Sequence, residues 1–169
     1  MRRFLILAFL LFLTLVLPGT LFHLLAWSGI KPDLTMLLVI YIAQHSRPAS
    51  ALAWGLGAGL VEDLYLGHFV GMYSLTLTVV ALLTLYLNSR WYRENFILTV
   101  LLVFLVTAVG QLLIGFLGFG AGLSWSAGDI FRVVLGVSVY NAVLVLVTYP
   151  WIHRSFMQGW LRYQAKYER

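Results

Sequence analysis

The chain has 169 residues, of which 62% are hydrophobic and only 10% are charged, and its mean hydropathy is +0.93. This composition indicates a polytopic membrane protein and argues against a soluble domain with a single anchor, because apolar segments occupy nearly the full length. The absence of cysteine excludes disulfides, thiolate metal sites and cysteine nucleophiles. The net charge of +5 is better explained by anionic lipid and membrane orientation than by nucleic acid, so no nucleic-acid partner is predicted.

The first apolar run follows an Arg-Arg pair, an arrangement that also begins secretory signal peptides. Hydrophobicity resumes after Pro18 and Gly19, however, and no A-x-A cleavage pattern is present. We therefore interpret residues 4–27 as a transmembrane span that bends near Pro18.

The second apolar region is interrupted by the sequence QHSRP at residues 44–48, which leaves an uncharged run of about ten residues before the break. A run of that length is too short to cross a bilayer alone. We predict two short helices, residues 32–45 and 49–66, that form a hairpin across the membrane. Pro32 suits the first position of a helix, and Asp33 suits its positive amino end.

Three later segments, residues 71–87, 96–119 and 130–151, contain enough apolar length to cross the bilayer. The chain is thus predicted to be an all-α bundle of six transmembrane helices, residues 1–153, with a short tail, residues 154–169. A four-span alternative would bury Arg47 in the bilayer. With the amino terminus in the cytoplasm, the six-span topology leaves only Lys31 and Arg132 outside and satisfies the positive-inside rule. The basic residues placed inside are Arg2, Arg3, Arg47, Arg90, Arg93, Arg154, Arg162, Lys166 and Arg169.

The glycine-rich stretch WGLGAGLVEDLYLG, residues 54–67, is the most unusual part of the sequence. Small residues recur every four positions and therefore lie along one helix face, which allows a neighbouring backbone to approach closely. We predict a packing or partner interface at this face, with packing inside the bundle favoured over dimerisation. Its members are Ala51, Gly55, Gly59 and Asp63, and the spacing continues to Gly67 and Gly71 beyond the expected end of the helix.

Two interpretations of Asp63 remain open. Its carboxylate accepts hydrogen bonds from backbone amides or from a nearby cation, or it is simply solvated at the outer interface. Glu62 is expected to point about 100° away, toward water or lipid headgroups. Because adjacent helical residues diverge, the two acids are not predicted to act as a catalytic pair.

Other polar residues indicate structure rather than catalysis. Gln111 and Asn141 lie inside the fifth and sixth spans and are predicted to hydrogen-bond other helices. Ser126 to Asp129 resembles a capping box that opens the sixth span. The four histidines lack metal-ligand spacing, so no catalytic residue, metal site or cofactor is predicted.

The carboxyl-terminal tail carries aromatic residues at spacings of four, three and four, with basic residues broadly opposite. This pattern is typical of an amphipathic helix on the membrane surface. Simple anchoring is favoured over docking of a cytoplasmic partner, and the two are not exclusive. The aromatic residues are Phe156, Trp160, Tyr163 and Tyr167.

Three segments of the sequence resemble motifs of a known protein family: KPDLTMLLVIYIA from Lys31, GLGAGLVEDLYLG from Gly55 and VGMYSL from Val70. Together they resemble the MreD family of rod shape-determining proteins, with Pro32 and Asp33 as motif residues. Glu62 departs from that family's pattern, in which a more apolar residue is expected. The departure makes Asp63 the more informative acid.

The resemblance implies a non-enzymatic scaffold of the bacterial cell-elongation machinery in the cytoplasmic (inner) membrane. The partner it implies is the bitopic protein MreC, and through it MreB, a SEDS glycosyltransferase and a transpeptidase that synthesise peptidoglycan. It also implies a fold similar to that of the substrate-binding subunits of energy-coupling-factor vitamin transporters.

A vitamin-transporter subunit is the alternative function. Such a protein needs a polar pocket, but the available polar residues are scattered in the sequence, and the first span lacks paired small residues for coupling to a transport partner. The candidate pocket residues are His68, Gln111, Trp125, Asp129, Arg132 and Asn141.

Overall fold

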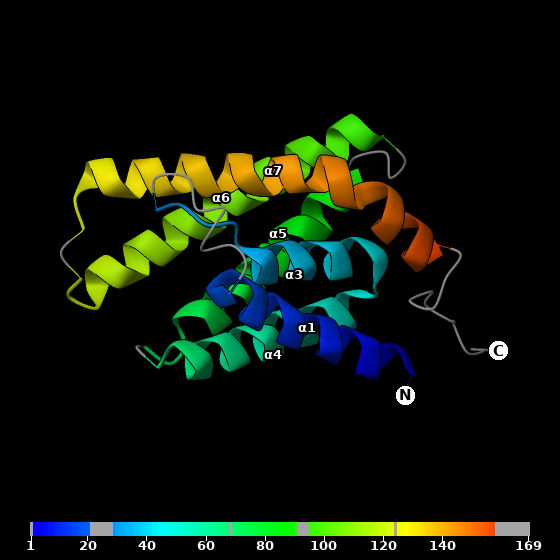
Figure 1. Ribbon diagram of the computed structural model, residues 1–169, viewed down its shortest axis with the longest axis horizontal. Helices are drawn as coiled ribbons and strands as arrows, with labels where there is room; N and C mark the ends of the chain where they lie inside the picture. The colour runs from blue at the N-terminus through cyan, green and yellow to red at the C-terminus, as the bar shows by residue number, and fades with distance from the viewer. Residues whose placement is uncertain (1, 21–28, 68, 91–94, 124, 158–169) are drawn as a thin grey trace.

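The computed structural model confirms the prediction of an all-helical, six-helix protein in the part of the chain that it describes (Figure 1). It describes residues 2–20, 29–67, 69–90, 95–123 and 125–157. The helices in these residues are α1 (Arg2–Thr20), α3 (Leu34–His45), α4 (Pro48–Leu66), α5 (Met72–Arg90), α6 (Phe96–Gly120) and α7 (Ala127–Met157).

Successive helices run in alternating directions along the long axis of the molecule (Figure 1). We call the end where α1 begins and α7 ends the terminal end, at the right of Figure 1. The opposite end, where the α4–α5 and α6–α7 connections lie, we call the hairpin end. This arrangement places the ends of two helical hairpins beside each other at one end of the bundle.

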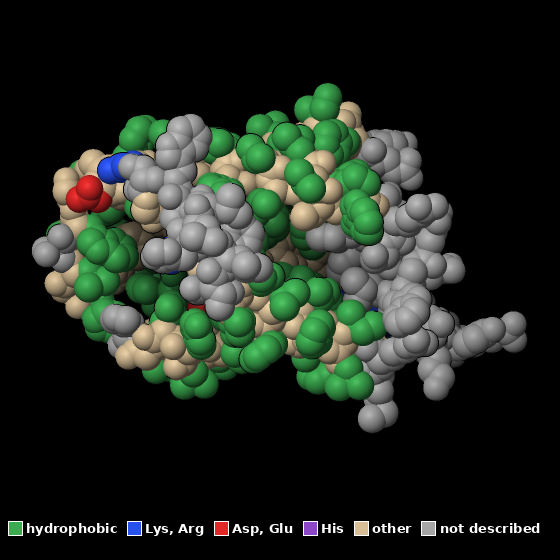
Figure 2. All heavy atoms as spheres, viewed as in Figure 1, with side chains coloured by type: hydrophobic (Ala, Val, Ile, Leu, Met, Phe, Trp, Pro, Cys, Tyr) green, Lys and Arg blue, Asp and Glu red, His purple; other side chains and the backbone are tan. Residues whose placement is uncertain are grey.

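Three helices in the described residues are long and apolar enough to cross a membrane: Met72–Ser89, Phe96–Gly120 and Ala127–Trp151. Two shorter apolar helices, Arg3–Pro18 and Leu34–His45, accompany them. Large hydrophobic side chains are exposed on the outside of the bundle, among them Phe131 and Trp151, which are 65% and 80% exposed. Figure 2 shows hydrophobic side chains over much of the visible described surface, as lipid contact requires.

The short helix α3 is the centre of the bundle. Its residues from Thr35 to Ala43 are all buried, because α1, α4, α5, α6 and α7 each contact it. With 12 residues, α3 rises only about 18 Å, against a hydrocarbon thickness of about 30 Å. The helix by itself is therefore too short to cross the hydrocarbon layer.

The helix boundaries differ from the predicted ones for local reasons. Pro32 is not the first helical residue, because Asp33 is the N-cap and its side chain accepts a hydrogen bond from the Met36 amide at 2.8 Å. The last helix begins at Ala127, where Ser126 Oγ accepts a 3.3 Å hydrogen bond from the Gly128 amide. It then continues through Pro150 to Met157.

The predicted first span is described only in part. Helix α1 ends at Thr20 with Pro18 inside it, and residues 21–27 of the predicted span lie outside the described residues.

Polar contacts join the helices at the terminal end. Arg3 donates a 2.7 Å hydrogen bond to Ser46 Oγ, which joins the start of α1 to the end of α3. Asn88 Nδ2 donates to the Gln44 carbonyl at 3.2 Å, which joins α5 to α3. Tyr41 and Thr148 join α3 to α7 through hydroxyls 3.0 Å apart.

Candidate functional site

Asp63 is a buried hydrogen-bond acceptor near the hairpin end. Its side chain is 1% exposed, so the alternative of a solvated interfacial acid is wrong. The carboxylate accepts hydrogen bonds from the amides of Gly71 at 2.9 Å, Tyr73 at 2.8 Å and Ser74 at 3.0 Å, and from Ser74 Oγ at 2.6 Å. An acid on α4 thus caps the positive amino end of the next helix, α5.

Glycine permits the approach of α4 to α5 that this cap requires. A Cβ atom added at Gly59 would lie 2.4 Å from Ser74 Cα, and one added at Gly55 would lie 2.8 Å from the Leu77 carbonyl oxygen. Ala51, on the same face, is also buried. The two helices therefore touch backbone to backbone along this face.

The last two glycines of the four-residue spacing lie in the α4–α5 connection and not on the packing face. Gly67 ends α4 with a φ of +67°, and Gly71 has a φ of +109°. Nothing lies within 4 Å of a Cβ added at either position. Their positive φ angles, and not close packing, explain the glycines.

Asp33 joins three helices at the amino end of α3. Its Oδ1 caps α3, and its Oδ2 accepts a 3.0 Å hydrogen bond from Gln111 Nε2 on α6. Asn141 on α7 pairs with the Asp33 backbone at 3.1 Å in both directions, as acceptor from the amide and as donor to the carbonyl. Pro32 beside it is buried. The structure thus brings Asp33, Gln111 and Asn141 together.

Replacing Asn141 with alanine is expected to destabilise the protein by about 1 to 3 kcal/mol, because it leaves the Asp33 amide without its acceptor and leaves the Asp33 carbonyl with the Leu37 amide as its remaining donor. Thermal unfolding in detergent measures the effect. The matched control is Val139→Ala on an exposed face of the same helix, which should unfold near the wild-type temperature. Equal melting of both variants would contradict the assigned role.

Glu62 does not point toward water or headgroups, so that prediction is wrong. Its Oε2 atom is buried and has no hydrogen-bond partner. Asp33 and Thr35 lie close to this side chain, because the amino end of α3 is inside the bundle next to α4. Glu62 is therefore a partly buried acid beside a second acid.

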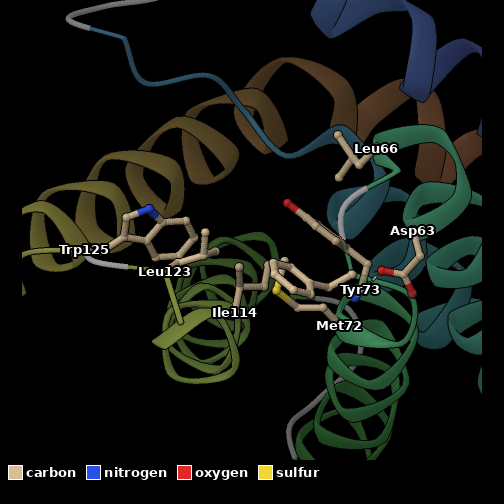
Figure 3. Close-up of a pocket in the computed structure, with 8 residues that line it drawn as sticks. Asp63, Leu66, Met72, Tyr73, Ile114, Leu123 and Trp125 are labelled. Carbon is tan, nitrogen blue, oxygen red and sulfur yellow. Dashed lines mark hydrogen bonds between the residues drawn. The ribbon is translucent and has the colours of Figure 1, made fainter. Parts of the chain in front are cut away.

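A cavity of about 260 Å³ lies at the hairpin end (Figure 3). Its lining comes from the end of α4, the start of α5, α6 and the α6–α7 connection, and most of it is apolar. We call it the hairpin pocket. Its lining residues are Asp63, Leu66, Phe69, Met72, Tyr73, Ile114, Leu123 and Trp125.

The sequence indicates only Asp63 and Trp125 among the residues that line this pocket. The other lining side chains are ordinary hydrophobic residues of separate segments, and only folding places them around one space. Among these residues, Met72 and Tyr73 belong to the family-like motif VGMYSL, which is the one sequence feature that points to the pocket lining.

The remaining predicted residues are not all described. Phe156 falls in α7, whereas Trp160, Tyr163, Tyr167 and His68 lie outside the described residues. Asp129 and Arg132 lie exposed near the start of α7. Within the described ranges, no group of three or more His, Cys, Asp or Glu side chains is arranged to hold a metal ion.

Comparison with known proteins gives a family but no individual relative. Residues 1–159 match the family described as rod shape-determining protein MreD. No curated protein and no solved structure matches the chain, so the expected similarity to energy-coupling-factor subunits stays a prediction. The match covers nearly the whole chain, including α4, the Asp63 cap and the pocket lining. With its membrane-length apolar helices, the chain belongs to the MreD family of rod shape-determining membrane proteins.

Proposed function

We propose that this protein is a non-enzymatic scaffold of the bacterial cell-elongation machinery that binds the bitopic protein MreC. Through MreC it helps to organise lateral peptidoglycan synthesis by a SEDS glycosyltransferase and a transpeptidase, in connection with MreB. The observation that carries the proposal is the family match over residues 1–159.

The hairpin pocket is the proposed docking site for MreC. It is apolar, lies between two helical hairpins, and is bordered by the partly exposed aromatic side chains of Phe69 and Trp125. Exposed aromatic residues around a concave apolar site are typical anchors of protein interfaces. A membrane-proximal segment of MreC would bury an apolar side chain in this space.

The proposed orientation follows from charge. With the terminal end in the cytoplasm, Arg3 and Arg47 face the inner leaflet, as the positive-inside rule requires. The hairpin pocket then opens toward the outer face of the cytoplasmic membrane. That is the side on which peptidoglycan is assembled.

The test is affinity capture of the tagged, full-length protein from its native membrane in mild detergent, with mass spectrometry of the retained proteins. Recovery of MreC with cell-wall synthases is expected. Recovery of ATP-binding subunits with a membrane coupling subunit would instead support vitamin uptake and overturn the proposal.

Trp125→Ala tests the docking site directly. Loss of a large aromatic anchor should weaken MreC binding by about tenfold or more, with little change in the melting temperature. Phe131→Ala is the matched control, because Phe131 is exposed near the start of α7 and does not line the pocket. Undiminished MreC binding by Trp125→Ala would place the docking site elsewhere.

A further inference from the structure

The hairpin pocket contains a hydroxyl group that the described part of the bundle leaves unpaired. Asp63 lines the pocket but is 1% exposed, and its carboxylate is engaged by the hydrogen bonds that cap α5. Tyr73 takes part in this cap with its backbone amide. No described residue hydrogen-bonds to the Tyr73 hydroxyl. The hydroxyl is therefore available to a group that enters the pocket.

The Tyr73 side chain is directed into the pocket. Figure 3 shows its ring extending away from the Asp63 carboxylate, with the hydroxyl oxygen toward the space between Leu66 and Leu123. The indole of Trp125 turns its six-membered ring toward Tyr73, and its nitrogen lies on the far side of the ring (Figure 3). Among the lining residues, the inward-facing polar group is thus the Tyr73 hydroxyl, set in a wall of aliphatic and aromatic surface.

The size and composition of the cavity suit an aromatic side chain. Its volume of about 260 Å³ exceeds the roughly 150 Å³ of an apolar protein cavity that binds benzene, so one phenol or indole ring fits inside. Phe69, Tyr73 and Trp125 offer aromatic rings, and Met72 offers a thioether sulfur. Both kinds of group make favourable contacts with a further aromatic ring.

The hydroxyl distinguishes an aromatic occupant with a polar tip from a purely apolar one. A lipid acyl chain or an aliphatic side chain would cover the Tyr73 hydroxyl without offering it a hydrogen bond, and that burial is unfavourable. A Tyr or Trp side chain carries an O–H or N–H group at the edge of an apolar ring. The pocket lies at the hairpin end of the bundle, and Tyr and Trp side chains concentrate at the ends of membrane helices.

We propose that the hairpin pocket receives a Tyr or Trp side chain of the docking protein, and that the polar tip of this side chain hydrogen-bonds the Tyr73 hydroxyl. The ring packs against the aromatic and thioether groups of the wall, and the hydrogen bond selects it over an aliphatic side chain. The inference rests on the proposed function, because it names the kind of side chain with which MreC anchors in the pocket.

The first test is Tyr73→Phe, which removes the hydroxyl and keeps the ring. With full-length protein and full-length MreC in lipid nanodiscs, the dissociation constant should rise about three- to tenfold, the effect of losing one neutral hydrogen bond. The melting temperature of the isolated variant should stay at the wild-type value, because the backbone amide still donates to Asp63. Tyr65→Phe is the matched control, since Tyr65 is 59% exposed on α4 and does not line the pocket.

The second test identifies the partner side chain. Alanine substitution of each Tyr and Trp in the membrane-proximal segment of MreC should reveal one position at which the affinity falls about tenfold or more. Phenylalanine at that position keeps an aromatic ring and removes the polar tip. Combined with Tyr73→Phe, this change should weaken binding no further than either change alone, because both remove the same hydrogen bond.

The outcomes separate this inference from the proposed function. If wild-type protein binds MreC and Tyr73→Phe binds equally well, the inference is overturned and the scaffold proposal stands. The same holds if binding depends on an aliphatic residue of MreC and on no Tyr or Trp, or if Tyr73→Phe lowers the melting temperature together with the affinity. If wild-type protein does not bind MreC, the scaffold proposal fails and the inference fails with it.

Discussion

Replacing Gly59 with leucine will prevent the bundle from folding. A Cβ atom at this position would lie 2.4 Å from Ser74 Cα and 2.5 Å from the Ser74 nitrogen, which are backbone atoms of α5. A side-chain clash can relax by rotation, but a backbone clash forces the two helices apart. Separation would also break the Asp63 cap, so the expected cost exceeds about 3 kcal/mol. The measurement is the yield of monodisperse protein and its melting temperature in detergent.

Gly57→Leu is the matched control for this substitution. Gly57 lies on the same helix, and nothing lies within 4 Å of a Cβ added there. The control replaces the same residue type with the same side chain and should give near wild-type yield. A well-folded Gly59→Leu protein with a normal melting temperature would show that α4 and α5 are not packed as described.

Asp63→Asn is expected to destabilise the protein by about 1.5 to 3 kcal/mol, because it weakens the charge-assisted hydrogen bonds at this carboxylate and leaves at least one buried donor without an acceptor. The asparagine amide group has nearly the same shape, but it keeps one of the two oxygens and puts an NH2 group in place of the other. Either the Tyr73 amide, which donates to Oδ1, or the amides of Gly71 and Ser74, which donate to Oδ2, then lose their acceptor. The backbone amides at the start of α5 should therefore be the first to lose their protection against hydrogen exchange. Thermal unfolding together with amide hydrogen exchange of residues 71–76 measures both effects.

Asp129→Asn controls for the loss of one negative charge, because Asp129 is exposed. Its melting temperature should stay within a degree or two of the wild type, since exposed substitutions cost less than about 0.5 kcal/mol. If Asp63→Asn and Asp129→Asn have the same melting temperature, the Asp63 carboxylate is not required as the cap of α5.

The all-helical fold could be predicted from the sequence because it depends on local properties. Apolar length sets the number of helices, and the spacing of four from Ala51 to Asp63 places one face of α4. That face is the one on which Gly55 and Gly59 meet α5. Composition and periodicity are sufficient for such features, since both are properties of single segments.

The contacts of the acids could not be predicted, because they depend on segments far apart in the sequence. The sequence alone leaves two interpretations of Asp63, because its donors lie on α5, and it predicts the wrong orientation for Glu62. The partners of Asp33 are Gln111 and Asn141, more than seventy residues away. The hairpin pocket could not be predicted for the same reason, since the residues that line it come from segments far apart in the sequence.

The Asp63 cap has a consequence for the biogenesis of the protein. The donors that satisfy this acid all belong to residues 71–74, which leave the ribosome after α4. Helix α3 is short and α4 carries two acids, so neither is a strong insertion signal by itself. We expect α4 to enter the bilayer stably only together with α5. The order of synthesis, and not hydrophobicity alone, then determines when the hairpin formed by α4 and α5 inserts into the bilayer.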